Sequence, residues 1–365
     1  MKVAIVHDWL TGMRGGEKVV ECICELFPEA DLFTLVYVKE NISQTINSHK
    51  IVPSFIDSLP FGRKHYKLYL PFFPLAIESF DLSDYDLILS SSTCVAKGVI
   101  TNSTSKHICY CNTPMRYAWE FRNLYTRSLR PRWLLAPVFS LVLSYLRMWD
   151  VATALRPDHF IANSQNIARR IKSHYGLSSS VVFPPVDSSF FFPSEQEPHD
   201  YWFVLSAMVP YKKLEIAIEA FNESGRKLKI AGDGSERKKL EKMAASNIEF
   251  LGRVNDDEVL SLLQNARGLI FPGEEDFGIT PLEANACGRP VVAYKAGGVI
   301  ETQTEFTASF FDEQTAESLN SAVEIANSRE FDSLAIRKHA EGFARSVFKE
   351  EYMKVVNAVL KERKV

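Results

Sequence analysis

The sequence predicts an α/β protein made of two Rossmann-like domains, each a parallel sheet covered by helices. Short apolar strands alternate with amphipathic helical segments along most of the 365 residues, which is the pattern of parallel sheets with helices on both faces. A proline-containing, increasingly polar stretch, 181–200, interrupts this alternation once and reads as a connection between domains. The length also suits two domains, each large enough for its own core.

The composition excludes some functions. With a net charge of −3 and 46% apolar residues, the chain does not fit a nucleic-acid-binding protein, which would be strongly basic. The six cysteines show neither C-x-x-C nor metal-ligand spacing, so we expect reduced core residues. Met1 leads directly into a strand, and no apolar run reaches the roughly 18–20 residues that span a bilayer. We therefore expect a cytoplasmic protein that is soluble or peripheral to the membrane.

The first domain opens like a Rossmann unit. A strand, 2–6, runs into a glycine-punctuated loop, 7–16, and helical spacing begins at Glu17. The loop lacks G-x-G-x-x-G, so a nicotinamide or flavin site has little support. Gly15 and Gly16 make either a tight turn or a backbone that closes on a diphosphate or acceptor. Further strands are expected at 32–37, 86–90, 106–111 and 159–163.

Two segments of this domain combine bases with apolar side chains. Residues 63–73 mix bases with aromatics, and in 127–149 an apolar stretch is flanked by Arg127, Arg130, Arg132 and Arg147. This composition suits the surface of an anionic membrane, and it suits an ordinary core helix with arginines at its ends equally well. Pro137 predicts that the second segment is not one uninterrupted helix.

The second domain repeats the alternation. Strands 202–206, 227–231 and 248–251 end in polar or glycine-rich loops that we expect along one edge of a sheet. The first of these loops contains Lys212 and Lys213. Because bases at a helix N-terminus oppose the helix dipole, their placement is easier to understand if an anion binds there. A solvated helix end is the alternative.

A fourth strand, 268–271, leads into the most informative stretch, 271–290. We expect a helix with Thr280 as N-cap, Pro281 at its first position, Glu283 at its third, and Gly288 past its end. A helix start behind a glycine-containing turn is a ready phosphate site. Glu275 before the turn and Glu283 within the helix are placed to accept hydrogen bonds from sugar and ribose hydroxyls. Thr280 and Glu283 also match a capping box, which would make Glu283 structural.

This stretch resembles the signature of the retaining glycosyltransferases of family 4. The family's wording is close to E-G-F-G-x-x-x-x-E-A-x-A-C-G-x-P-V-V, and residues 275–292 read E-D-F-G-I-T-P-L-E-A-N-A-C-G-R-P-V-V. The resemblance implies a GT-B fold of two facing Rossmann-like domains, with a C-terminal helix that crosses back to the first. It also implies a nucleotide-sugar donor, retention of configuration and a backbone near Gly15 and Gly16 that meets the donor; enzymes of this family carry a similar glycine pair followed by a glutamate.

The segment N-T-P-M-R-Y-A-W-E, 112–120, resembles the H-T-P-M-R-Y-x-W-[DE] of bacterial O-antigen mannosyltransferases within the family. Asn112 replaces the common histidine, and it can hydrogen-bond to a sugar hydroxyl but cannot carry a proton as imidazole does. Arg116 is expected to bind an acceptor phosphate or to form a structural pair, and Tyr117 is expected to lie in the same acceptor site.

One position departs from the family pattern. Family members carry arginine then lysine in R-L-x-P-x-K to hold the diphosphate, and this chain keeps Lys212 but has Ala207 in the arginine's place. Lys213 or Arg253 would supply the missing positive charge, or the helix start at 278–280 would contribute more to stabilising the diphosphate.

These observations combine into one prediction of domains and sites. We expect an acceptor-binding domain at 1–190, a nucleotide-sugar-binding domain at 191–345 and a C-terminal helix at 346–365 that packs on the first domain. The expected catalytic residues are Glu275, Lys212 and Asn112, and acceptor binding is assigned to Arg116 and Tyr117. Donor binding is assigned to Gly15, Gly16, Lys213, Gly252, Arg253, Phe277, Gly278, Ile279, Thr280 and Glu283.

The predicted function is retaining transfer of a hexose in bacterial surface-polysaccharide (O-antigen, lipopolysaccharide) synthesis. The resemblance favours mannose from GDP-mannose and an acceptor glycan carried on a polyprenyl diphosphate. No D-x-D motif stands where a metal-dependent donor site would need it, so we expect no metal and no other cofactor. A UDP-sugar donor, a nucleotide-sugar epimerase of the same fold and a non-catalytic binding module are the alternatives.

Overall fold

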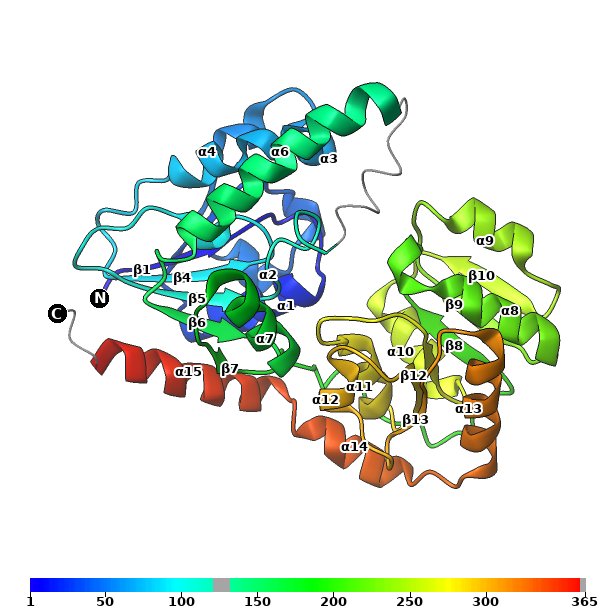
Figure 1. The fold of residues 1–365 in the computed structure, drawn as a ribbon. Coiled ribbons are helices and arrows are strands. Elements are labelled where there is room, and N and C mark those ends of the chain that lie inside the picture. The colour runs from blue at the N-terminus through cyan, green and yellow to red at the C-terminus, as the bar shows by residue number, and fades with distance from the viewer. Residues whose placement is uncertain (121–131, 362–365) are drawn as a thin grey trace. The chain divides into compact units, whose positions relative to one another are not determined.

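The computed structural model describes residues 1–120 and 132–361, with the side chains of 132–134 left aside. The chain forms two compact units, Met1–Phe183 with Phe348–Val365, and Pro184–Val347. Each unit contains one parallel β-sheet covered by helices, as the alternation predicts (Figure 1).

The first crossing between the units falls between Phe183 and Pro184, inside the segment that the sequence marks as the connection. The boundary expected after residue 190 lies a few residues further along. The second crossing falls within the last helix, so that most of this helix belongs to the first unit.

The first unit has a seven-stranded sheet in the order β3-β2-β1-β4-β5-β6-β7. The strand order reverses between β1 and β4, which makes their carboxyl ends the place where α/β sheets bind ligands. The two shortest strands, β3 and β7, were not predicted. The strands are β1 Val3–His7, β2 Asp31–Thr34, β3 Ile51–Pro53, β4 Leu87–Ser92, β5 Lys106–Cys111, β6 His159–Ala162 and β7 Ser180–Val181.

Helices cover both faces of this sheet (Figure 1). Helix α7 begins after a capping side chain: the Ser164 hydroxyl accepts a hydrogen bond from the Ile167 N–H at 3.1 Å. The α-helices are α1 Gly15–Leu26, α2 Gln44–Asn47, α3 Gly62–His65, α4 Phe73–Glu78, α6 Arg132–Thr153, α7 Gln165–Tyr175 and α15 Arg345–Lys361. The 3-10 helices are η1 Lys39–Asn41, η2 Phe55–Ser58, η3 Tyr66–Phe72 and η4 Ala96–Gly98.

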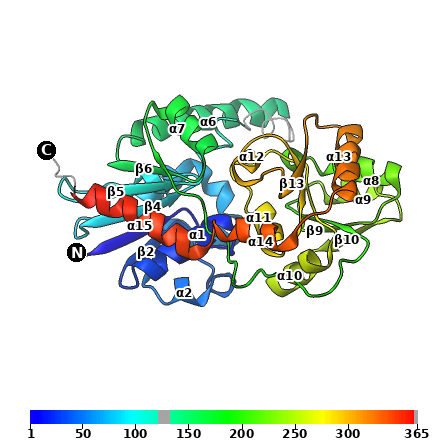
Figure 2. The ribbon, with the colours of Figure 1, turned by 90° about the horizontal axis from the view of Figure 1, so that it is seen from below.

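The C-terminal helix α15 packs into the first unit, beside α1 (Figure 2). Its apolar face joins the core cluster of β1, β4 and β5 through Phe348, Tyr352, Val356 and Val359. At its edge the Lys349 ammonium lies 2.5 Å from the Glu25 carboxylate on α1. Burying side chains of this size contributes about 1.5–3 kcal/mol each, so α15 is a structural part of this unit.

Helix α6 continues through Pro137, so the predicted interruption is wrong. Pro137 lies in the second turn, where it removes a single backbone hydrogen bond while the rest of the helix packs on the sheet. Within α6, the segment Leu135–Thr153 is long and apolar enough to cross a membrane by length and composition, with a mean hydropathy of 1.3. Such a run was not predicted because Arg147 and Asp150 interrupt it.

The second unit has a six-stranded sheet in the order β10-β9-β8-β11-β12-β13. Here the order reverses between β8 and β11. Strands β12 and β13 were not named in advance. The strands are β8 Trp202–Leu205, β9 Leu228–Ala231, β10 Ile248–Gly252, β11 Leu269–Phe271, β12 Val291–Tyr294 and β13 Ala308–Phe311.

The helices of the second unit follow the strands in alternation, and the stretch from residue 316 is mostly helical. They are η5 Pro210–Lys212, α8 Leu214–Ser224, α9 Arg237–Met243, α10 Asp256–Asn265, α11 Ile279–Ala286, α12 Val299–Thr302, α13 Ala316–Ser328 and α14 Ser333–Glu341. All six cysteines of the chain are buried, which confirms them as core residues.

Candidate active site

The site in the second unit is built around the start of α11. This helix begins at Ile279, and its N-cap is Gly278 in the left-handed conformation (φ +87°), with no side chain bonded to the helix end. The predicted N-cap Thr280 and the capping box with Glu283 are therefore wrong, because the helix starts two residues earlier. Pro281 then stands at the third position, which also lacks an intrahelical N–H partner and so tolerates proline.

The uncapped start of α11 is open to an anion. Without a capping side chain, the N–H groups of Gly278, Ile279 and Thr280 all lie at a helix end where the helix itself offers them no acceptor. These three residues are partly exposed. The far end is as predicted: Gly288 follows the C-cap in a left-handed conformation (φ +72°). The helix dipole and the open N–H groups favour a negatively charged ligand at Gly278–Thr280.

Gly278 is needed for two reasons. Its positive φ is unfavourable for a side chain, and a Cβ atom there would lie 3.2 Å from the ring of Phe271 at the end of β11. The neighbouring Phe277 is buried, and its ring centroid is 6.4 Å from that of Phe343. Phe277 thus anchors the loop in the core while Gly278 turns the backbone towards the surface.

Lys212 and Glu275 meet at the point where the strand order reverses. Lys212 ends η5 after β8, Glu275 lies in the loop after β11, and their side chains form an ion pair. Both side chains are mostly buried, with 19% and 14% of their surface exposed. The backbones of the two loops lie close together: a Cβ atom added to Gly273 would lie only 2.9 Å from the Lys212 Cα.

A third loop, after β12, completes this edge of the sheet. The Gly298 N–H donates to the Glu275 carbonyl oxygen at 2.8 Å, and Gly297 pairs with Glu275 as an isolated β-bridge. Cβ atoms on Gly297 and Gly298 would lie 2.3 and 2.4 Å from the backbone of residues 275–277. This loop was not predicted. Its signal was two adjacent glycines three residues after the end of an apolar strand.

Glu283 lies inside α11 and is buried, with 7% of its surface exposed. Burial, followed by the negative charge of Glu283, raises the pKa of the neighbouring Cys287 thiol to about 12. The predicted contact of Glu283 with a ribose stays a prediction.

The other predicted donor residues lie at neighbouring strand ends of the second unit. Lys213 caps α8, and its ammonium is 3.7 Å from the Glu215 carboxylate. Arg253 follows Gly252 at the end of β10, is 85% exposed, and lies 3.6 Å from the Asp233 carboxylate. Each cation therefore already has a carboxylate nearby. Whether either replaces the missing arginine at position 207 stays a prediction.

In the first unit, Gly15 and Gly16 form the first turn of α1 and do not make a separate tight turn. A Cβ atom on Gly16 would lie 3.7 Å from the His7 ring and 3.8 Å from the Asn112 side-chain nitrogen. Asn112 donates to the Ser91 hydroxyl at 3.0 Å, and the His7 Nδ1 lies 3.0 Å from the Ser91 carbonyl oxygen. The ends of β1, β4 and β5 therefore meet here. His7 and Ser91 were not predicted as site residues.

Arg116 and Tyr117 follow this cluster on the loop after β5. Arg116 is half-buried. The Tyr117 hydroxyl is 2.6 Å from the Cys94 sulfur, and its ring packs against the core between the sheet and α6. Burial raises the pKa of Tyr117 well above its usual value. Acceptor binding by these two residues stays a prediction, and the contacts of Tyr117 are those of a core residue.

Glu17 in the first turn of α1 is buried beside this cluster. Its carboxylate accepts a hydrogen bond from the Arg14 N–H at 3.2 Å and closes a capping box. Burial raises the pKa of Glu17, and the charges of His7 and Arg14 oppose that shift. Among the described residues, no group of three or more His, Cys, Asp and Glu side chains is arranged to hold a metal ion.

Two family models match the chain, one after the other. The model described as Glycosyltransferase Family 4 matches residues 13–190, and the model described as Glycosyl transferases group 1 matches residues 187–341. Together they cover most of both units, and the second contains the Lys212–Glu275 pair. The chain belongs to glycosyltransferase family 4.

Named relatives of this family-4 glycosyltransferase include sugar transferases of bacteria. It is 28% identical over 179 residues to D-rhamnosyltransferase WbpZ of Pseudomonas aeruginosa, covering 46% of this chain and 47% of that protein. It is 31% identical over 105 residues to O-antigen chain mannosyltransferase C of Escherichia coli, covering 27% and 28%. The matched segments thus span less than half the length of these relatives.

Solved structures confirm the predicted GT-B fold of this family-4 glycosyltransferase. HepE of Anabaena, determined in complex with UDP, superposes with a TM-score of 0.72 at 16% identity, over 98% of this chain and 100% of that chain.

Proposed function

We propose that this family-4 glycosyltransferase transfers mannose from GDP-mannose to a lipid-linked glycan, with retention of configuration, in the synthesis of a bacterial surface polysaccharide. The observation that carries the proposal is the placement of Lys212 and Glu275 together at the reversal point of the second sheet. The open start of α11 follows Glu275 on the same loop. A cation, a carboxylate and a set of N–H donors are the groups that a diphosphate-linked sugar requires.

Each group has a role in this chemistry. As the sugar–phosphate bond breaks, negative charge grows on the leaving diphosphate and positive charge on the sugar ring. The Lys212 ammonium and the N–H groups at Gly278–Thr280 stabilise the leaving oxygens as that charge develops. Glu275 accepts hydrogen bonds from the donor sugar's hydroxyls, and Glu283 accepts those of the ribose. Lys212 offsets the repulsion between Glu275 and the diphosphate, since the two side chains are ion-paired.

The names of the relatives support a sugar of the manno configuration. One is named a D-rhamnosyltransferase and another an O-antigen chain mannosyltransferase. D-Rhamnose is mannose without the oxygen at C6, so the two sugars have the same ring hydroxyl groups, to which a donor site can hydrogen-bond. These relatives also favour a glycan acceptor of a bacterial surface polysaccharide.

The first unit supplies the acceptor side of the proposal. Asn112 hydrogen-bonds a sugar hydroxyl, and Arg116 binds the acceptor's diphosphate. The acceptor hydroxyl attacks from the face that the diphosphate leaves, which retains the configuration. Such a glycan is carried on a lipid, so the enzyme works at the inner face of the plasma membrane.

Transfer is proposed to proceed without a metal ion, because Lys212 and the α11 start already neutralise the leaving group. Treating the enzyme with EDTA should leave its rate unchanged, and a loss restored by Mg²⁺ or Mn²⁺ would contradict this part of the proposal. The control is the same assay with Mn²⁺ added to enzyme that has not been treated with EDTA.

The donor is tested with two radiolabelled nucleotide sugars. Label from GDP-mannose should enter a lipid-linked acceptor, whereas label from UDP-glucose should not. The UDP complex of HepE favours the UDP-sugar alternative, and transfer from UDP-glucose alone would establish it. Turnover of GDP-mannose at the same rate without acceptor would instead indicate an epimerase or a hydrolase.

A further inference from the structure

The outer face of α6 is apolar and exposed. Large side chains recur every three or four residues along it, a spacing that places them on one side of a helix. Leu141 is 73% exposed and Met148 is 67% exposed. The exposed apolar residues of this face are Leu135, Val138, Leu141, Tyr145, Met148, Val151 and, just past the helix end, Leu155.

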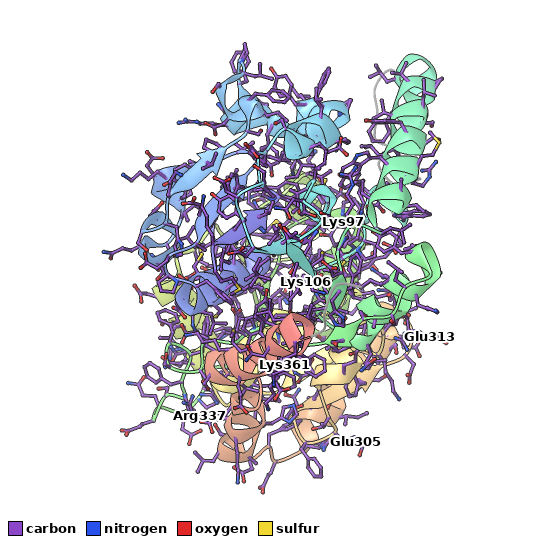
Figure 3. All side chains as sticks on the ribbon, turned by 90° about the vertical axis from the view of Figure 1, so that its left-hand side faces the viewer. Lys97, Lys106, Glu305, Glu313, Arg337 and Lys361 are labelled. Carbon is purple, nitrogen blue, oxygen red and sulfur yellow. The ribbon has the colours of Figure 1, made fainter. Side chains whose placement is uncertain are left out.

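The inner face of α6 is fixed to the first unit, so the outer face cannot turn inwards. Leu143 and Leu146 are fully buried. Asp150 is also buried, and its carboxylate lies 3.1 Å from the ammonium of Lys97, labelled in Figure 3. The Trp119 indole and the Tyr175 hydroxyl donate to the same carboxylate at 2.8 and 2.9 Å. A buried ion pair with these extra hydrogen bonds is costly to break.

A second exposed apolar group lies next to α6. Segment 61–75 runs through α3, η3 and the start of α4, whose inner residues share one core cluster with α6, and Figure 1 shows these helices beside it. The Trp149 indole of α6 donates to Glu78 at the end of α4 at 2.9 Å. The exposed apolar residues of this segment are Phe61 (73%), Leu68 (77%), Phe72 (53%) and Leu75 (59%).

Segment 61–75 carries charges of one sign. Residues 61–75 contain no acidic residue, although the whole chain carries a net charge of −3. Within the described parts of the chain, no carboxylate lies at ion-pair distance from Lys64 or Lys67, and both are exposed. Nearby carboxylates are already paired, because Asp57 binds Arg63 at 2.8 Å and Glu78 binds Arg156 at 2.7 Å. No carboxylate of the described residues therefore neutralises either ammonium group, although burial lowers the pKa of Lys67.

We propose that the outer face of α6 and the exposed side of segment 61–75, together called the apolar-basic face, bind the surface of a membrane that contains anionic lipids. In this arrangement α6 lies in the plane of the interface, its apolar side chains enter the boundary of the lipid tails, and Lys64 and Lys67 meet lipid phosphates. A spanning helix does not fit, because Asp150 and Lys97 fix the inner face to the protein. An ordinary core helix does not fit either, because only 17% of Leu135–Thr153 is buried.

Vesicle flotation tests the proposal and needs no nucleotide sugar, so its outcome is independent of the proposed transferase reaction. The full-length protein should float with vesicles of phosphatidylcholine and phosphatidylglycerol at low salt, and much less with phosphatidylcholine alone. The double variant Leu141→Glu/Met148→Glu should reduce the bound fraction about tenfold or more, because it places charge in the apolar boundary. Lys64→Glu/Lys67→Glu should remove the preference for the anionic vesicles.

A matched control uses exposed apolar residues of the second unit. Phe306 (79% exposed) and Leu334 (74% exposed) lie outside the apolar-basic face, and Phe306→Glu/Leu334→Glu should float like the unmodified protein. Circular dichroism of each variant checks folding. Unchanged flotation of a folded Leu141→Glu/Met148→Glu protein, or equal binding to both vesicle types, overturns the proposal. A third result would also overturn it: the unmodified protein is a dimer in light scattering and does not float, and the Leu141→Glu/Met148→Glu variant is a monomer. The apolar-basic face would then join two copies of the chain.

Discussion

Lys212 and Glu275 form an ion pair although they follow different strands of the second sheet and are far apart in sequence. The strands β8 and β11 that precede them are neighbours at the reversal of the strand order, so their loops leave the sheet side by side. In the proposed function, this topology explains how a carboxylate can lie near a diphosphate, because the Lys212 ammonium offsets the charge of both anions.

Replacing Glu275 by Gln should lower kcat/KM by more than roughly 30-fold, which corresponds to a loss of about 2 kcal/mol in transition-state stabilisation. The reason is that an amide binds sugar hydroxyls less strongly than a carboxylate does. The affinity for GDP should stay equal or rise, since Lys212 loses its competing partner. Initial rates and calorimetric titration with GDP measure the two effects. The matched control is Glu274→Gln at the exposed neighbouring position. A comparable loss of rate in the control would contradict a specific role for Glu275.

Replacing Lys212 by Met should weaken GDP binding by about 1.5–3 kcal/mol, the value of a charge-assisted hydrogen bond. Binding of GMP should weaken less, because GMP lacks the terminal phosphate. Lys213→Met provides the comparison, since the Lys213 ammonium lies near Glu215. If Lys213→Met has the larger effect, the diphosphate is held by Lys213, and the roles assigned to the two lysines are reversed.

Substituting Gly278 by Ala should both destabilise the second unit and weaken nucleotide binding. A left-handed backbone costs a side chain about 1–2 kcal/mol, and the added Cβ would press on the Phe271 ring. Gly225→Ala separates the two effects: it has a similar φ of +68°, but a Cβ atom added there would have no neighbour within 4 Å. Thermal unfolding should shift in both variants, whereas GDP affinity should fall only in Gly278→Ala.

The sequence was sufficient to predict the fold, the family and most strands of both sheets. Strands such as 106–111 and 202–206 are buried apolar runs between helices, a pattern that tertiary contacts do not override. The glutamates and glycines of 275–288 carried the family resemblance. Both depend on residues close together in the chain, where local chemistry decides the structure.

The errors have physical causes. The start of α11 was misplaced because Thr280 and Glu283 satisfy a capping box locally, while Gly278 turns the chain two residues earlier next to Phe271. The loop at Gly297 and Gly298 was missed because its importance comes from a backbone contact with Glu275 across the sheet. Such contacts join positions that no local pattern relates.

Glu17 should make stability depend on pH. Burial raises its pKa above the ordinary value of 4.5, so that between the two values the folded state holds a proton that the unfolded state has released. Stability from this group therefore falls as pH rises from about 4.5 through the folded pKa. Glu17→Gln keeps the oxygen that caps α1 but cannot ionise. Its Tm should match that of the parent at acidic pH and exceed it near neutral pH, whereas a constant difference would contradict this account.

The exposed Glu29 provides the control for this series, because Glu29→Gln removes a carboxylate without any burial. Its Tm difference from the parent should not grow between acidic and neutral pH. Measuring all three proteins in the same buffers cancels the contributions of the other ionisable groups.

Two tyrosines in the core where α15 packs on the first unit, Tyr110 of β5 and Tyr352 of α15, should respond differently to the loss of their hydroxyl groups. The Tyr110 hydroxyl donates to the Val182 carbonyl oxygen at 2.9 Å, whereas the Tyr352 hydroxyl is buried without a hydrogen-bond partner among the described residues. The rings themselves are 6.3 Å apart in the same cluster. Tyr110→Phe should thus lower the free energy of unfolding by about 1 kcal/mol, and Tyr352→Phe should leave it unchanged or raise it by up to about 1 kcal/mol. Urea unfolding of the two variants measures both values. A loss in Tyr352→Phe as large as that in Tyr110→Phe would show that the Tyr352 hydroxyl has a partner, and that α15 is held by a polar contact as well as by its apolar face.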